Sequence, residues 1–132
     1  MNHLLLMYLT IGFGSALGGV ARYATGALAV ALWGPGFPWG TIIINIAGSF
    51  VIGGFATLTG PDGRWLVSPL RRQFVMVGLC GGYTTFSAFG LETFDLLRAG
   101  RIAAAAANVG LSLALCLAAA LAAHLWARRL NQ

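Results

Sequence analysis

The feature that most constrains this chain is a long stretch without any formal charge. No Asp, Glu, Lys or Arg occurs from Tyr23 to Pro61, and only 8% of the 132 residues are charged. Soluble domains carry roughly 25% charged residues. The stretch is too long for a soluble core, so the sequence predicts an all-α membrane protein whose residues 1–132 form a single transmembrane domain.

The net charge of +5 comes entirely from arginine, because the chain has no lysine. A basic excess can indicate nucleic acid, but these arginines lie mostly at the ends of apolar segments, where Arg normally flanks membrane helices. We therefore expect membrane lipid, and no nucleic acid, as a partner. Cys80 and Cys116 fall inside apolar segments and are interpreted as small buried residues, so neither a disulfide nor a cysteine metal site is indicated.

Four segments are long and apolar enough to cross a bilayer, which takes about 20 residues of helix. The predicted spans are 4–32, 39–58, 70–97 and 102–126. No Lys or Arg precedes the first span, and it exceeds the apolar core of a signal peptide, so we expect it to be retained. Short turns between the spans predict antiparallel neighbours. Five arginines lie on the side of the termini against two or three on the other side, a weak bias that still permits insertion in both orientations.

The third span contains the sequence GGYTTFSAF at residues 81–89. Adjacent glycines weaken a helix, and an unsatisfied backbone group in hydrocarbon costs several kcal/mol. Irregular backbone is therefore tolerated at membrane depth only inside protein or beside a polar cavity. The pattern predicts a helix that is broken in the middle of the membrane to build an ion site.

Several polar side chains near this break are candidates for the ion site. Asn45 lies among isoleucines, where an amide either bonds across a helix interface or faces a cavity. Phe86 and Phe89 share a helix face, and the positive edges of their rings can contact an anion. Thr85 and Ser87 add hydroxyl donors beside these rings. Such donors suit a small anion, while free carbonyls at a helix break suit a small cation.

Two open interpretations apply to most of the remaining polar residues of the spans. Asn108 and Ser112 share one face of the fourth helix, as structural hydrogen-bonding groups or as part of a polar lining. Arg22 either snorkels to the headgroups or supplies positive potential at a vestibule. Glu92 lies roughly two turns beyond the break, where its structural role would be a salt bridge to Arg22, Arg98 or Arg101 near the interface.

Small residues recur four positions apart, which lets helix backbones approach closely. The pairs are Gly14/Gly18, Ser15/Gly19, Ser49/Gly53 and Gly78/Gly82. Packing within one bundle explains any single pair. Together the pairs indicate more helix surface than one chain needs, and four short helices enclose little space, so a pore of this size is expected to be an oligomer.

These stretches resemble the small fluoride channels of the CrcB or Fluc family. The matching sequences are GGVARY at 18–23, WGTIIINIAGSF at 39–50 and GLCGGYTTFSAFGLE at 78–92, and the third is highly specific. Length and loop positions agree as well, so the resemblance covers essentially the whole chain.

The resemblance implies an antiparallel, dual-topology homodimer with two fluoride pores in a bacterial inner or plasma membrane. The broken third helices would cross at the dimer centre, where backbone carbonyls of Gly81 and Thr84 hold a structural sodium ion. Phe86, Phe89 and Asn45 match pore residues of the family. The polar lining would include Thr85, Ser87 and Ser112, whereas some members have Tyr at the position of Asn108.

The function that the resemblance implies is passive fluoride efflux, which protects the cell from fluoride toxicity. No nucleotide site or catalytic constellation is present, so no enzyme is expected. An alternative is a small dimeric proton-coupled multidrug exporter, which would need a carboxylate at the membrane centre. A structural membrane subunit is a further alternative, but it leaves Asn45 and the glycine break unexplained.

Overall fold

The computed structural model of the protein describes residues 2–132, and the chain is helical along most of this length. The elements in chain order are α1 (His3–Trp33), α2 (Trp39–Leu58), α3 (Pro69–Gln73), the π-helical η1 (Phe74–Cys80), α4 (Gly81–Tyr83), α5 (Phe86–Arg98) and α6 (Ile102–Asn131). Among these residues there is no strand.

Four helical stretches are long and apolar enough to cross a membrane. They are His3–Trp33, Trp39–Leu58, Pro69–Arg98 and Ile102–Asn131. The prediction of an all-helical protein with four candidate spans is therefore confirmed, and the second span has the predicted bounds. The fourth helix continues beyond the predicted end at residue 126, because arginine and leucine are good helix formers and Arg128 and Arg129 stabilise the negative end of the helix dipole.

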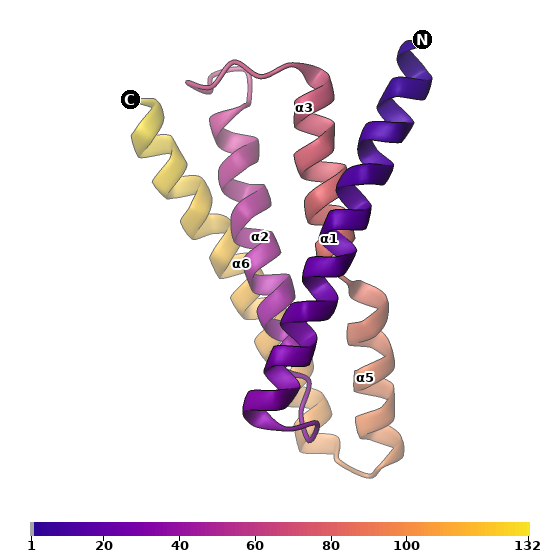
Figure 1. Ribbon diagram of the computed structural model, residues 1–132. Helices are drawn as coiled ribbons and strands as arrows, with labels where there is room; N and C mark the ends of the chain where they lie inside the picture. Colours follow the sequence, from indigo (N-terminus) through magenta and orange to yellow (C-terminus); the bar gives the residue numbers. More distant parts are fainter. Residues whose placement is uncertain (1) are drawn as a thin grey trace.

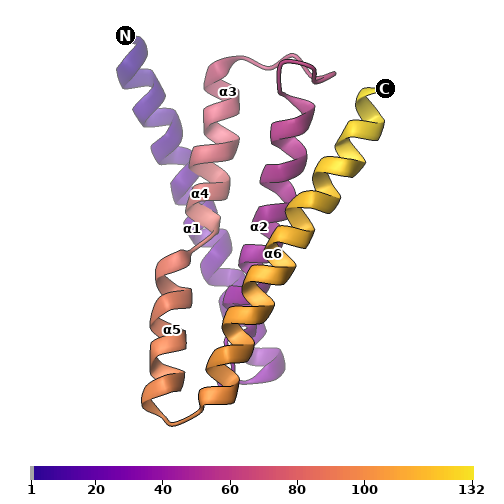
Figure 2. The ribbon, with the colours of Figure 1, turned by 180° about the vertical axis from the view of Figure 1, so that it is seen from behind.

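The spans run antiparallel to their neighbours in the chain. Both termini and the 59–68 loop lie at one end of the molecule, and the turns at 34–38 and 99–101 lie at the opposite end (Figure 1). Seen from behind, α5 occupies the half of the molecule near these turns, while α3 occupies the other half (Figure 2). The third span is thus divided into two halves that lie end to end.

Glycines of α1 bring the first and third spans into close contact. A Cβ added at Gly18 would lie 2.7 Å from the Tyr83 backbone N, and one at Gly14 would lie 2.8 Å from the Phe74 carbonyl O. A Cβ at Gly82 would lie 2.7 Å from the Ser15 Cα. These small residues are therefore used within one chain, as in the simpler of the two interpretations, whereas Gly19 has open space around it.

The helix pair α2 and α6 forms the most extensive contact between two elements of the molecule. A Cβ at Gly53 would lie 2.9 Å from the Ala120 carbonyl O, and Ala123 and Ala127 of α6 are fully buried. Small side chains thus let these two helices pack closely. The irregular part of the third span packs instead against α1 and, less extensively, α2.

Candidate functional site

The backbone leaves the helical conformation at two residues between α4 and α5. Thr84 has φ −80° and ψ 158°, and Thr85 has φ −152° and ψ 123°, so both are extended. The seven residues before α4 are π-helical, a form that often occurs at functional sites. Helix α5 then begins afresh at Phe86, with the Thr85 hydroxyl capping it by accepting from the Ala88 N–H at 3.1 Å.

The side chain of Asn45 compensates for the hydrogen bonds that the extended residues lose. The Thr85 N–H donates to Asn45 Oδ1 at 2.8 Å, and Asn45 Nδ2 donates to the Thr85 carbonyl O at 2.9 Å. A buried backbone group without a partner would cost as much as a lost hydrogen bond. Asn45 therefore stabilises the extended backbone from α2, and the second hydrogen on its Nδ2 is left for another acceptor.

A cleft of about 310 Å³ lies beside this pair. Five of the predicted pore residues line it, namely Asn45 on α2, Thr85 between α4 and α5, Phe86 and Phe89 on α5, and Ser112 on α6. The ring centroids of Phe86 and Phe89 are 5.3 Å apart, as expected for neighbours on one helix face. Among residues 2–132 no acidic side chain lines the cleft, and its polar surface consists of amide, hydroxyl and carbonyl groups beside two cysteine thiols.

Ser87 does not line this cleft. Its side chain is exposed, and its Oγ shares a hydrogen bond of 3.2 Å with Thr85 Oγ1. Ser87 therefore contacts the cleft only through Thr85, and a second molecule or lipid has access to its outer side.

A chain of hydrogen bonds holds the α6 side of the cleft. Asn108 is fully buried and donates through Nδ2 to Thr93 Oγ1 at 2.9 Å, and the Thr93 hydroxyl donates to the Phe89 carbonyl O at 2.7 Å. Ser112 donates to Asn108 Oδ1 at 3.5 Å. Asn108 thus links α6 to α5 and positions Phe89 and Ser112, whereas Asn108 itself does not line the cleft.

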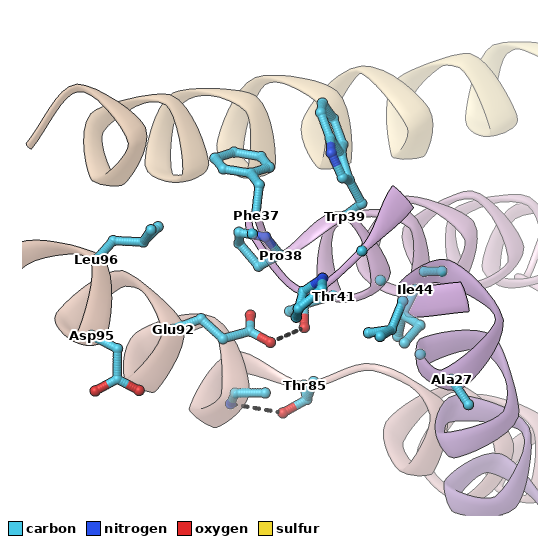
Figure 3. Close-up of a pocket in the computed structure, with 18 of the residues that line it drawn as sticks. Ala27, Phe37, Pro38, Trp39, Thr41, Ile44, Thr85, Glu92, Asp95 and Leu96 are labelled. Carbon is cyan, nitrogen blue, oxygen red and sulfur yellow. Dashed lines mark hydrogen bonds between the residues drawn. The ribbon is translucent and has the colours of Figure 1, made fainter. Parts of the chain in front are cut away.

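A second, larger cavity of about 790 Å³ opens toward the turns at 34–38 and 99–101, and Figure 3 shows its lining. Its charged and polar residues include Arg22, Thr41 and Glu92. Thr85 lines this cavity as well as the smaller cleft. The two spaces are therefore adjacent, with Thr85 on the boundary between them.

Glu92 accepts a hydrogen bond from the Thr41 hydroxyl at 2.7 Å, as the dashed line in Figure 3 shows. The prediction that Glu92 forms a salt bridge with an arginine is wrong, because the only ion pair within residues 2–132 joins Arg98 and Asp95. The neutral Thr41 hydroxyl satisfies one carboxylate oxygen, and the other, Oε2, is buried without a partner in this part of the chain.

Arg22 reaches the break directly. Its Nη1 donates to the Thr84 carbonyl O at 3.2 Å, and the residue lines the larger cavity. Of the two interpretations of Arg22, the structure thus shows contact with a cavity and with the break. Its guanidinium adds positive charge between the larger cavity and the irregular backbone.

The break leaves carbonyl oxygens of the kind that a small hard cation would use, at Gly81 and in part at Thr84. The amide that would bond the Gly81 carbonyl in a regular α-helix belongs to Thr85, and it donates to Asn45 instead. The Thr84 carbonyl accepts from Arg22, but a carbonyl oxygen has a second lone pair. Both residues line the smaller cleft, and oxygen is the ligand that hard cations prefer.

Sequence reasoning missed Thr41 and Ser49 as lining residues. Thr41 lines the larger cavity and Ser49 the smaller cleft. The signal was present in the spacing, because polar residues at 41, 45 and 49 are each four positions apart and share one face of α2. Together these residues form a polar stripe that passes both spaces.

The chain is similar to known proteins along nearly its whole length. A family described as CrcB-like protein, Camphor Resistance (CrcB), matches residues 9–124. The chain is 52% identical over 126 residues to the Fluoride-specific ion channel FluC 1 of Rhodopseudomonas palustris, covering 96% of this chain and 89% of that protein. It is 51% identical to the FluC of Opitutus terrae, with 95% of each chain covered, and 50% identical to the FluC of Rhodospirillum rubrum, with 96% and 98% covered.

Proposed function

The chain belongs to the CrcB family, and we propose that it is a fluoride-specific ion channel through which fluoride leaves the cell passively. The resemblance of its motifs to this family is thereby confirmed. The protein is a multi-pass membrane protein and no enzyme, and its relatives come from bacteria. The observation that carries the proposal is the cleft that brings Asn45, Thr85, Ser112, Phe86 and Phe89 together.

The proposed pathway runs from the larger cavity past Thr85 into the smaller cleft. Fluoride is small and strongly hydrated, so the pore must replace its water with hydrogen-bond donors. The free hydrogen of Asn45 Nδ2 supplies one such donor. The hydroxyls of Thr85 and Ser112 supply two more when they turn from Ser87 Oγ and Asn108 Oδ1 toward the anion. The positive ring edges of Phe86 and Phe89 assist over the apolar part of the cleft. Larger halides would be excluded by the width of the pathway.

Electrostatics favours an anion in the smaller cleft. Among residues 2–132 no acid lines this cleft, and Arg22 adds positive charge where it meets the larger cavity. The larger cavity itself has both signs of charge, with Glu92 and Asp95 beside Arg22 and Arg101. The potential across the membrane contributes about 2.3 kcal/mol per charge for each 100 mV, which expels an anion from a negative interior. Efflux therefore needs no coupled ion and no nucleotide, and it removes fluoride that has entered as the neutral acid.

The multidrug exporter is not favoured. Proton-coupled export of cations needs a carboxylate that faces the substrate at the membrane centre. Glu92 is the acid nearest to the break, but its Oε1 accepts from Thr41 in the larger cavity, and it does not line the smaller cleft. A cation in the cleft would therefore meet no carboxylate.

We propose that the working unit is an antiparallel homodimer, in which the third helix of each subunit is broken at membrane depth. Phe86 is 79% exposed in the single chain although it lines the cleft, so one wall of the cleft is open. Glycines on the helix surfaces, among them Gly19, Gly90 and Gly110, have no described atom within 4 Å of an added Cβ and permit close approach of another helix. A second subunit would close the cleft and contribute half of each pore.

A structural sodium ion at the dimer centre is the cofactor of this proposal, held by the Gly81 and Thr84 carbonyls. Support comes from the diverted Thr85 amide, which leaves the Gly81 carbonyl without its helical partner. When bound, the ion supplies positive charge that offsets part of the cost of a dehydrated anion nearby. Exchanging sodium for N-methyl-D-glucamine should lower the dimer fraction in light scattering, and an unchanged fraction would remove the ion from the account.

The pore role of the phenylalanines is tested with two matched variants of α5. Phe86→Ile alters a ring that lines the cleft, whereas Phe94→Ile alters an exposed ring that lines neither cavity. Liposomes loaded with potassium fluoride are treated with valinomycin, and a fluoride electrode records efflux. We expect wild-type rates in Phe94→Ile and a rate at least about tenfold lower in Phe86→Ile. Loss of the ring edge should raise the barrier to fluoride passage, and each increment of about 1.4 kcal/mol in the barrier lowers the rate about tenfold. Equal rates in the two variants would remove Phe86 from the pathway.

A further inference from the structure

The 59–68 loop presents apolar side chains at the end of the molecule where both termini lie (Figure 1). Leu66 is 99% exposed and Trp65 is 49% exposed. The loop contains no helix, so these two side chains do not continue the apolar surface of a membrane span. In water such exposure would be unfavourable, whereas tryptophan is enriched at the membrane–water interface.

Hydrogen bonds to two helices hold this loop in place. The Arg64 N–H donates to Asn131 Oδ1 at 3.1 Å, and Arg64 Nη1 donates to the Leu130 carbonyl O at 2.7 Å. The Trp65 N–H donates to the Leu58 carbonyl O at 3.0 Å, which ties the loop to the end of α2. Trp65 and Leu66 are therefore presented by a fixed loop, beside the last turn of α6.

Positive charge surrounds the same loop. Arg71, Arg128 and Arg129 are exposed at this end, and none has an acidic partner within residues 2–132, where the one ion pair joins Arg98 and Asp95. Asp62 is the only acid in or next to the loop. The guanidinium group binds phosphate through two parallel N–H donors, which makes arginine well suited to phosphate recognition.

We propose that this end of the molecule binds anionic phospholipid. Trp65 and Leu66 enter the membrane interface, and Arg71, Arg128 and Arg129 contact the phosphates of the surrounding headgroups. The role of arginine in setting helix orientation explains the charges but not the almost fully exposed Leu66 at the same end of the molecule. The combination of an apolar pair with unpaired arginines fits a molecule that offers both acyl chain and anionic headgroup.

Native mass spectrometry of the full-length protein tests the proposal. The protein is equilibrated in detergent with equal amounts of phosphatidylglycerol and phosphatidylcholine of identical acyl chains, and the retained lipids are counted. The wild type should prefer phosphatidylglycerol. An arginine near a membrane surface contributes about a fivefold preference. The triple variant R71Q/R128Q/R129Q should therefore lose most of the preference, while the matched variant R71K/R128K/R129K should keep a part of it.

The contribution of Trp65 and Leu66 is tested with a separate variant, and the readout is the total amount of lipid retained. W65S/L66S should lower the retention of both lipids while leaving the preference for phosphatidylglycerol in place. Soluble glycerol phosphate in excess should displace little lipid, and displacement would identify a site for free phosphate instead. Equal retention of the two lipids by the wild type, or an unchanged preference in the glutamine variant, would overturn the proposal. Fluoride efflux is expected to persist in all these variants, because none of the substituted residues lines either cavity.

Discussion

At the residue scale, Asn45 stabilises the extended backbone of the third span. Both of its polar atoms bond to Thr85, the Oδ1 at 2.8 Å and the Nδ2 at 2.9 Å. The two interpretations of this residue, an interhelical hydrogen bond and a cavity-facing amide, are therefore compatible. One amide hydrogen holds the break, and the other is available to an anion in the cleft.

Asn45→Asp tests the amide donors of this residue, because the substitution keeps the size of the side chain. The carboxylate keeps the acceptor for the Thr85 N–H but removes the donor to the Thr85 carbonyl, and it places a negative charge on the proposed fluoride path. Two like charges at 4 Å repel by about 4 kcal/mol at an effective dielectric of 20. We expect fluoride efflux from liposomes to fall by at least about tenfold.

The matched control is Asn2→Asp, which makes the same chemical change at the start of α1. Asn2 Oδ1 accepts from the Leu4 N–H at 3.2 Å, and aspartate caps a helix as well as asparagine does. Efflux in Asn2→Asp should equal that of the wild type. Undiminished efflux in Asn45→Asp, with a normal elution profile, would contradict the pore role of Asn45.

At the scale of elements, the third span is the part of the fold that depends most on its neighbours. Its irregular backbone packs against Gly18 of α1 and Gly48 of α2, where an added Cβ would contact the Tyr83 N and the Thr84 methyl respectively. These two glycines leave the space that the extended residues occupy. The position of the break is thus set by adjacent helices as well as by its own sequence.

Gly18→Ala is predicted to destabilise the protein. The new Cβ would lie 2.7 Å from the Tyr83 backbone N, so α1 and α4 must move apart, and overpacking of this kind costs about 1–3 kcal/mol. The control is Gly12→Ala on the same helix, which has open space and gains up to about 1 kcal/mol of helix propensity. The midpoint of thermal unfolding in detergent should fall for Gly18→Ala and not for Gly12→Ala. Equal midpoints would show that α1 does not constrain the break.

At the scale of the whole molecule, the proposed antiparallel dimer requires both orientations in one membrane. The arginine bias of five against two or three is weak, and this permits dual insertion. Asp62→Cys, in a background with Cys80 and Cys116 replaced by alanine, gives one thiol on the exposed 59–68 loop. A membrane-impermeant maleimide applied to intact cells should label about half of the protein. Complete labelling, or labelling only after permeabilisation, would contradict the antiparallel dimer.

The sequence predicts the four spans and the connections between them well, because apolar length and the Gly–Pro turn at 33–38 leave few alternatives. It also identifies Asn45, Thr85, Phe86, Phe89 and Ser112, which line one cleft in the structure. It does not predict the π-helical turn at 74–80 or the hydrogen bond of Thr41 to Glu92. Both depend on how separate spans pack, and the periodicity of a single span carries no information about that.

The most direct test of the central claim is the selectivity of efflux from liposomes that contain the purified wild-type protein. The vesicles are loaded with equal concentrations of potassium fluoride and potassium chloride, and valinomycin is added to release potassium. Electrodes then record both anions in the same sample. A fluoride-specific channel should release fluoride rapidly while chloride is retained. Loss of chloride at a comparable rate, or retention of both anions, would contradict it.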